Sequence, residues 1–109
     1  MKTVRKVRVV IAPPHVFISD VGRLIKRARL GAQDAFWEAE GPYTGEVSWQ
    51  QLKDLGAHYV ILGHSERRTH LGETDEMINR KVRAVTGGGM TAVVCIGERE
   101  RAEGEIPEL

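Results

Sequence analysis

The sequence has only one cysteine, Cys95, and lacks long uninterrupted apolar runs. A single cysteine cannot form a disulfide within the chain, which excludes a fold held by internal disulfides and is consistent with a reducing compartment. No apolar run is long enough for a membrane helix, so we expect no membrane partner. Residues 1–8 are too few, and too poor in serine and apolar side chains, for a transit or signal peptide, and we expect a cytoplasmic protein.

Neither sign of charge is in excess, because 16 basic residues face 15 acidic ones for a net charge of +1. This balance leaves no excess of positive charge of the kind that binds nucleic acid, so no nucleic-acid partner is expected. One local basic cluster precedes the first predicted strand, and we interpret it as a solvated approach to that strand, with a binding arm as the alternative. The cluster consists of Lys2, Arg5, Lys6 and Arg8.

The pattern of a metal site is also missing. No two histidines stand at ligand spacing with a carboxylate or thiolate beside them, and we expect neither a metal nor a cofactor. The histidines are His15, His58, His64 and His70.

What the sequence does contain is a regular alternation of strand and helix patterns. Strands are predicted at about 8–12, 30–33, 58–63 and 91–96. One helix is predicted near Ser19 with an apolar stripe through Leu24, a second from Ser48 to Gly56 with a capping box, and a third from about Asp75 to the glycines at 87–89. Strict alternation implies right-handed crossovers and a parallel sheet, which is the α/β class.

The strand at 58–63 ends at the most informative residue, His64. The strand is apolar on both faces, which predicts a parallel sheet covered on both sides. The histidine then lies at the C-terminal edge, where α/β folds bind ligands, and Ser65 to Leu71 can form a short helical turn with its N–H groups facing the imidazole. Such a histidine can act as a neutral hydrogen-bond donor; the alternative is a structural histidine satisfied by a neighbouring loop.

The segment Ile-Leu-Gly-His-Ser-Glu-Arg-Arg at 61–68 and five others in the same order resemble the triosephosphate isomerase family. The other segments are 10–14, 30–34, 43–48, 71–75 and 93–98, with Pro42 and Asp34 as small departures, the latter from a commoner Asn. The resemblance implies that 1–109 is one partial domain, the second to fifth strands of a TIM (β/α)8 barrel. A complete barrel needs at least about 200 residues, so 109 residues cannot close one alone.

The resemblance also implies an activity, the interconversion of dihydroxyacetone phosphate and glyceraldehyde 3-phosphate through an enediolate. His64 would be the electrophile, a neutral imidazole at a helix N-terminus as described for this family. Glu66 would be a supporting carboxylate that meets the family's active-site lysine. The alternative, without a functional role, is that residues 66–68 form a solvated charged turn.

The loop at 41–46 resembles the family's projecting loop, which docks into the neighbouring subunit of a homodimer. Thr44 would touch the active site of the second subunit, and Glu46 would meet Arg67 there. The alternative is that the loop is a flexible connection between a strand and a helix, without a binding role. Cys95 could be read as a nucleophile near His64, but we favour an inert core residue in barrel packing.

Several parts of the family pattern have no counterpart in this sequence. These are an Asn and a Lys on the first strand, a Glu base, a mobile lid and the glycine-rich phosphate loops. We therefore expect the chain alone to be inactive. Without the lysine, the Glu66 carboxylate must be hydrated, protonated or paired with Arg67 or Arg68.

Two functions follow as hypotheses. The first is a fragment of a triosephosphate isomerase, through truncation, a split reading frame or an incomplete sequence, with a triose phosphate substrate and a possible complementing chain. The start at Met1 and the end at Leu109 favour this hypothesis. The second is a non-catalytic half-barrel that serves as a binding or assembly module.

Overall fold

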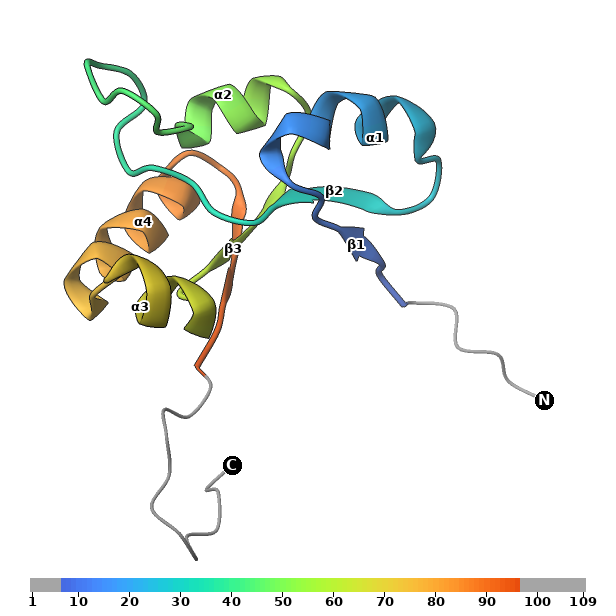
Figure 1. Cartoon of the computed structure of the whole chain (residues 1–109). Coiled ribbons are helices and arrows are strands. Elements are labelled where there is room, and N and C mark those ends of the chain that lie inside the picture. The colour runs from blue at the N-terminus through green and yellow to red at the C-terminus, as the bar shows by residue number, and fades with distance from the viewer. Residues whose placement is uncertain (1–6, 97–109) are drawn as a thin grey trace, which may run out of the picture.

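The computed structural model describes residues 7–96 of the chain, and Figure 1 shows how their helices and strands are arranged. The elements alternate along the chain in the predicted manner. In order they are β1 (Val10–Ile11), η1 (His15–Phe17), α1 (Ile18–Leu24), β2 (Arg29–Ala32), α2 (Trp49–Asp54), β3 (Tyr59–Leu62), α3 (Ser65–Leu71), α4 (Asp75–Gly87) and β4 (Thr91–Val94).

The strands form a four-stranded sheet in the order β1-β2-β3-β4, with every pair parallel. Tyr59 marks the middle of the sheet, because it is in register with Gly31 on one side and with Thr91 on the other. Each strand thus pairs with its neighbour in sequence, and the sheet does not close. The predicted α/β class and the partial barrel are confirmed.

A hydrophobic core fills the layer between the sheet and its helices. Val60 and Leu62 on β3 and Leu52 on α2 are all fully buried. Removing such a side chain from water contributes about 2 kcal/mol, so this layer is the main source of stability. The core also contains Ile18, Leu30, Ala32, Ala35, Ala57, Val85 and Met90.

The opposite face of the sheet is open, and the prediction of a strand covered on both sides is wrong for this chain. Tyr59 and Ile61, which alternate with the buried residues of β3, are only half-buried. On the outer strands, Val10 and Val93 lie on the same face as Tyr59 and Ile61, and they are 37% and 43% exposed. The helices lie on the outer side of the strands in Figure 1, and no described element covers the inner side. The apolar pattern is therefore that of a barrel strand whose inner neighbours are absent among residues 7–96.

The strand ends also differ from the prediction. The first and last strands are shorter than 8–12 and 91–96, because regular pairing exists only where both partners have extended backbones. Single hydrogen bonds prolong the pairing, from Arg29 N–H to Val9 O at 2.7 Å and from Cys95 N–H to Leu62 O at 2.9 Å. Cys95 follows β4 and is only partly buried, so its assignment to a core is wrong here, since β4 is an edge strand.

The helix near Ser19 begins at Ile18, after a turn of 3-10 helix that the sequence pattern did not indicate. Ile18 is fully buried, whereas Leu24 is 77% exposed and does not belong to the predicted stripe. Leu24 is about one residue short of two full turns from Ile18, which places it off the buried face. Ile25 already has an extended backbone, with ψ 143°, so the helical period does not continue.

The second predicted helix is confirmed in its details. The Ser48 side chain accepts a hydrogen bond from the Gln51 N–H at 3.1 Å, and the Gln51 side chain accepts one from the Ser48 N–H at 3.0 Å. Gly56 follows the C-cap residue Leu55 with φ +96°, the left-handed conformation that ends a helix. In α4, Ile78 and Val85 are buried.

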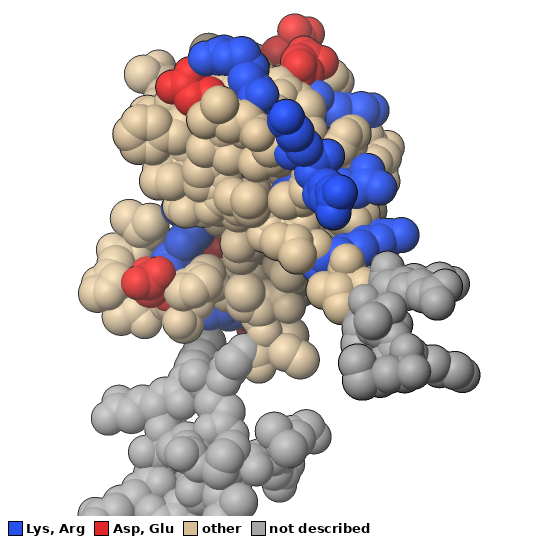
Figure 2. Space-filling view, turned by 90° about the vertical axis from the view of Figure 1, so that its right-hand side faces the viewer, with Lys and Arg blue, Asp and Glu red and all other residues tan. Residues whose placement is uncertain are grey.

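Lysines and arginines gather on the face shown in Figure 2. The turn between α1 and β2 contributes exposed Lys26 and Arg27, and β2 begins with exposed Arg29. Within residues 7–96, no helix combines the length and the apolar character that crossing a bilayer requires.

Candidate functional site

The chain leaves β3 through a glycine turn that fixes the direction of the next residue. Gly63 has φ +74°, and a side chain at this position would come within 3.3 Å of Ile78. A left-handed conformation and a close neighbour both favour glycine here. His64 follows with ψ 140° and caps the N-terminus of α3. The histidine therefore lies at the C-terminal edge of the sheet, as predicted.

Two groups of Glu66 face the same ring nitrogen of His64. The Glu66 backbone N–H lies 3.1 Å from Nδ1, and the carboxylate Oε1 lies 3.4 Å from it. They require opposite protonation states, since the N–H needs an unprotonated Nδ1 and the carboxylate needs a protonated one. The Glu66 carboxylate is 78% exposed, where water screens it, and the N–H is the closer partner.

The shorter contact fits a tautomer of His64 in which Nδ1 accepts a hydrogen bond from the backbone of α3. In that tautomer the proton is on Nε2, which can donate.

His64 lies at the rim of an open pocket of about 450 Å³ at the C-terminal end of the sheet. The imidazole is 44% exposed. The pocket wall is tied together by side chains, because His15 Nε2 lies 3.0 Å from the Asp34 carbonyl and Gln33 donates to the Ala12 carbonyl at 2.9 Å. The lining residues are Ala12, Pro14, His15, Val16, Gln33, Asp34, Ile61, His64, Glu66 and Arg67.

Behind this pocket lies a group of four charged side chains that we call the ion cluster: Asp34, Arg67, Glu73 and Lys81. Lys81 Nζ is 3.0 Å from Asp34 Oδ1 and 2.6 Å from Glu73 Oε2. Arg67 is 3.1 Å from Asp34 Oδ2 and 3.1 Å from Glu73 Oε2. Each cation therefore contacts both carboxylates, and the four charges sum to zero.

Glu73 is the most enclosed acid of the ion cluster, with its side chain 1% exposed. Burial alone would raise its pKa. Hydrogen bonds from Lys81 and Arg67, together with their positive charges, outweigh burial, so the pKa of Glu73 lies below its ordinary value. Both cations contact the same oxygen, Oε2, and Oε1 has no hydrogen-bond partner among the described residues.

Sequence reasoning missed Lys81, Glu73 and the role of Asp34, although one signal was available. Lys81 stands at a helical interval from Ile78 and Val85, inside the apolar stripe of α4, and it is 1% exposed. A lysine on a buried helix face needs a carboxylate within reach. Its partners come from the end of β2 and from the turn before α4, so the chain pattern did not identify them.

The structure separates Glu66 from its neighbour Arg67. The Glu66 carboxylate is 78% exposed, and Arg67 and Arg68 pair with other carboxylates instead. Arg67 turns inward to the ion cluster, and Arg68 donates to the Gly63 carbonyl at 3.2 Å. The interpretation of 66–68 as a uniformly solvated turn is therefore wrong.

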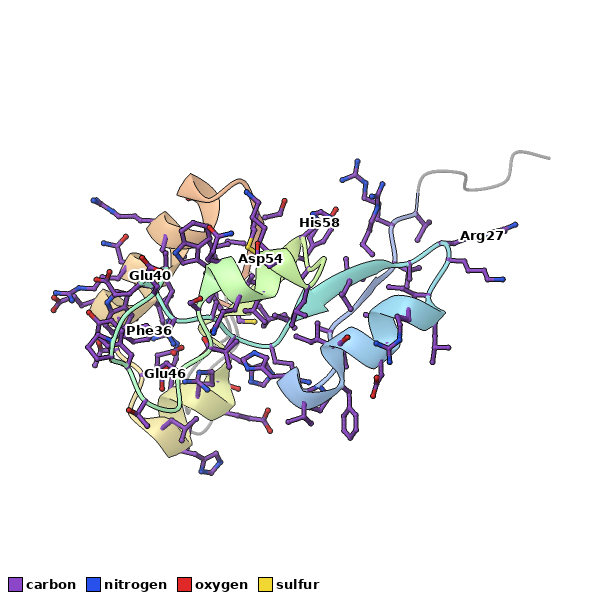
Figure 3. All side chains as sticks on the ribbon, turned by 90° about the horizontal axis from the view of Figure 1, so that it is seen from above. Arg27, Phe36, Glu40, Glu46, Asp54 and His58 are labelled. Carbon is purple, nitrogen blue, oxygen red and sulfur yellow. The ribbon has the colours of Figure 1, made fainter. Side chains whose placement is uncertain are left out.

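The loop between β2 and α2 projects from the body but is closed at its base. Phe36 N–H donates to the Val47 carbonyl at 2.8 Å, and the Tyr43 ring packs on Phe36 with centroids 4.7 Å apart. Thr44 and Glu46 are exposed on this loop and do not line the pocket of His64. Figure 3 shows Phe36, Glu40 and Glu46 together at the side of the molecule away from Arg27.

No group of three or more His, Cys, Asp and Glu side chains is placed to hold a metal ion within residues 7–96. The site does place a hydrogen-bond donor, His64, beside an open pocket. Such a donor can stabilise an oxyanion that develops on a bound carbonyl compound.

Comparison with known proteins gives a consistent result. The family described as Triosephosphate isomerase matches residues 1–107. The chain is 47% identical over 108 residues to the triosephosphate isomerase of Thermoanaerobacter sp. (strain X514), covering 95% of this chain and 44% of that protein. It is 51% identical over 94 residues to that of Geobacter metallireducens, covering 84% of this chain and 38% of that protein. The chain thus spans less than half the length of these relatives.

Proposed function

Because this chain belongs to the triosephosphate isomerase family, we propose that it supplies the electrophile of an enzyme that interconverts dihydroxyacetone phosphate and glyceraldehyde 3-phosphate. His64 donates a hydrogen bond from Nε2 to the substrate oxygens as the enediolate forms. A neutral imidazole stabilises the developing negative charge by donating a hydrogen bond, and it adds no formal positive charge to the site.

The observation that carries this proposal is the hydrogen bond from the Glu66 N–H to Nδ1 of His64 at 3.1 Å. It occupies Nδ1, so that Nε2 carries the proton. Glu66 has a supporting role, because its backbone sets the tautomer while its exposed carboxylate is free to meet a lysine from a further segment.

The same proposal includes a homodimer of the complete enzyme. The projecting loop carries Thr44 and Glu46 in exposed positions, as a docking loop requires. Arg67 is the proposed contact of Glu46 across the interface. It is 29% exposed at the wall of the pocket, so part of its guanidinium remains accessible although Asp34 and Glu73 hold it.

The 109-residue chain alone is proposed to be inactive, in a cytoplasmic setting and without a cofactor. It holds the electrophile, whereas no residue of its sequence corresponds to the family's base or lysine. Without a base no enediolate forms, and a donor has no charge to stabilise.

A hybrid enzyme tests the proposal directly. In it, residues 1–107 of this chain replace the matching segment of the Thermoanaerobacter isomerase. We expect the hybrid to interconvert the two triose phosphates and His64→Gln to lower kcat by roughly 10²-fold or more, the scale for losing one well-placed oxyanion donor. His70→Gln, at a histidine outside the pocket on the same helix, is the matched control and should retain turnover.

A folded hybrid without turnover would contradict the proposal and favour a half-barrel binding or assembly module. Unchanged kcat in His64→Gln would remove the role given to His64. Turnover by the 109-residue chain alone, after removal of host isomerase, would contradict the proposed inactivity.

A further inference from the structure

The helix that orients His64 is not held in place by an apolar face. α3 has seven residues, and none of them is buried. Helices shorter than about 12 residues are marginal in water, and most helical stability in proteins comes from a packed apolar face. The position of α3 must therefore depend on its polar contacts.

Those contacts are concentrated on two arginines. Arg68 donates to the Gly63 carbonyl and pairs with Asp75, whose side chain is 81% exposed, and exposed pairs contribute little. Arg67 instead reaches the ion cluster, where it contacts Asp34 and Glu73. Its backbone carbonyl also accepts a hydrogen bond from the Glu73 N–H at 3.2 Å. Arg67 is thus the main attachment of α3 to the body.

Arg67 directly follows Glu66, whose N–H holds Nδ1 of His64. We propose that the ion cluster positions His64: Asp34, Glu73 and Lys81 fix Arg67, Arg67 fixes the first turn of α3, and that turn fixes the tautomer and direction of the imidazole. This inference rests on the proposed function and adds positioning residues that do not touch the substrate.

Asp34 completes this arrangement. Its carboxylate contacts both Arg67 and Lys81, so each cation lies between two anions and each anion between two cations. An Asn at this position would leave two cations sharing one carboxylate. The residues come from the end of β2, from α3, from the turn before α4 and from α4 itself, so the ion cluster ties α3 to three separate parts of the fold.

Glu73→Gln tests the inference, with Glu76→Gln as its matched control. Both substitutions remove one carboxylate, but Glu73 is buried in the ion cluster, whereas Glu76 pairs with Arg80 and is 76% exposed. In the hybrid enzyme, NMR measures hydrogen exchange at the Glu66 amide and the 15N shifts of the His64 ring. We expect exchange to accelerate by about 10-fold or more in Glu73→Gln and the Nδ1 shift to move away from that of a hydrogen-bonded acceptor.

Turnover in the hybrid enzyme gives the second readout. Glu73→Gln should lower kcat by about 10-fold or more while KM stays within about 2-fold, since a displaced electrophile affects the transition state more than substrate binding. Glu76→Gln should change neither constant. Asp34→Asn, which keeps the shape and one acceptor, should act in the same direction with a smaller effect, and it serves where Glu73→Gln fails to fold.

An active hybrid whose His64 shifts and kcat are unchanged in folded Glu73→Gln, or in Asp34→Asn where Glu73→Gln does not fold, would overturn the inference and leave the proposed function intact. A Glu66 amide without protection in the unmodified hybrid would overturn it as well. An inactive but folded unmodified hybrid would instead contradict the proposed function, while the NMR measurements would still decide on the positioning.

Discussion

Two single charged side chains, a lysine and a glutamate, are almost completely buried in this chain. Lys81 is 1% exposed and Glu73 is 4% exposed. Removing one partner of a buried ion pair costs about 3–5 kcal/mol, since the other charge is left without compensation. The ion cluster is therefore a place where one conservative substitution has a large effect.

The lowered pKa of Glu73 predicts how stability depends on pH. The folded protein holds this carboxylate ionised below the ordinary value of 4.5, so its contribution is fully present above that value and is lost as the pH falls through the folded pKa. We expect the hybrid enzyme to lose stability in this acidic range. Glu73→Gln should be less stable near neutrality, with the difference narrowing at low pH, as measured by urea midpoints from ~pH 6 to ~pH 3.

Glu76→Gln is the reference for that comparison, because Glu76 is exposed. Its midpoints should stay parallel to those of the unmodified protein. A constant difference between Glu73→Gln and the unmodified protein across the whole range would contradict the prediction.

The unit formed by β3, the turn and α3 connects a buried strand to an exposed donor. Gly63 lies in the turn before α3 and Gly72 directly follows α3, with φ +74° and φ +66°. Both positions need the left-handed conformation, but only Gly63 has a close neighbour, the Ile78 side chain at 3.3 Å. A side chain at Gly72 would meet nothing within 4 Å.

This difference gives a prediction about alanine substitutions. In the hybrid enzyme, Gly72→Ala should cost about 1–2 kcal/mol for its left-handed backbone. Gly63→Ala should cost about 1 kcal/mol more, because Ile78 must also move. Urea denaturation measures both. Equal losses would mean that Ile78 adjusts freely, and a smaller loss for Gly63→Ala would contradict the stated role of the turn.

The elements with local signals were predictable from the sequence, and those that depend on distant partners were not. The Ser48 cap, the Gly56 stop and the placement of His64 before a short helix are all encoded within a few neighbouring residues. The contact of Lys81 with Asp34 joins positions 47 residues apart, which a local pattern cannot reveal. Leu24 was misplaced because its helix ends before the apparent period does.

Within residues 7–96, the sheet has two edge strands without a further partner, β1 and β4, and one face that no described element covers. Val10 and Val94 are 37% and 42% exposed on these outer strands. The sequence alone predicted apolar residues on both sides of β3. It could not say what covers each side, because an apolar side chain shows that a strand packs against other segments but not which segments these are. The apolar pattern of a barrel strand is therefore recognisable in β3 although the sheet does not close.

Open edges predict association of the chain on its own. Unpaired N–H and C=O groups on apolar edge strands are templates for pairing with another chain. Purified alone, the 109-residue chain should associate as its concentration rises or unfold with low cooperativity. Sedimentation velocity over a range of concentrations, together with urea unfolding, measures both properties.

The hybrid enzyme is the control for this behaviour, because its remaining strands come from a complete relative. It should show a fixed oligomeric state and a sharp transition. A concentration-independent monomer with cooperative unfolding for the chain alone would contradict the prediction.

The order of the strands has a consequence for biosynthesis. Each strand lies beside the strand that precedes it in the sequence. During translation, every strand therefore leaves the ribosome after the strand with which it pairs. Contacts that are near in sequence form quickly, because little chain entropy is lost in closing them. The layer built on Ile18, Leu52 and Val85 can therefore assemble while translation continues, strand by strand, before any later segment has left the exit tunnel.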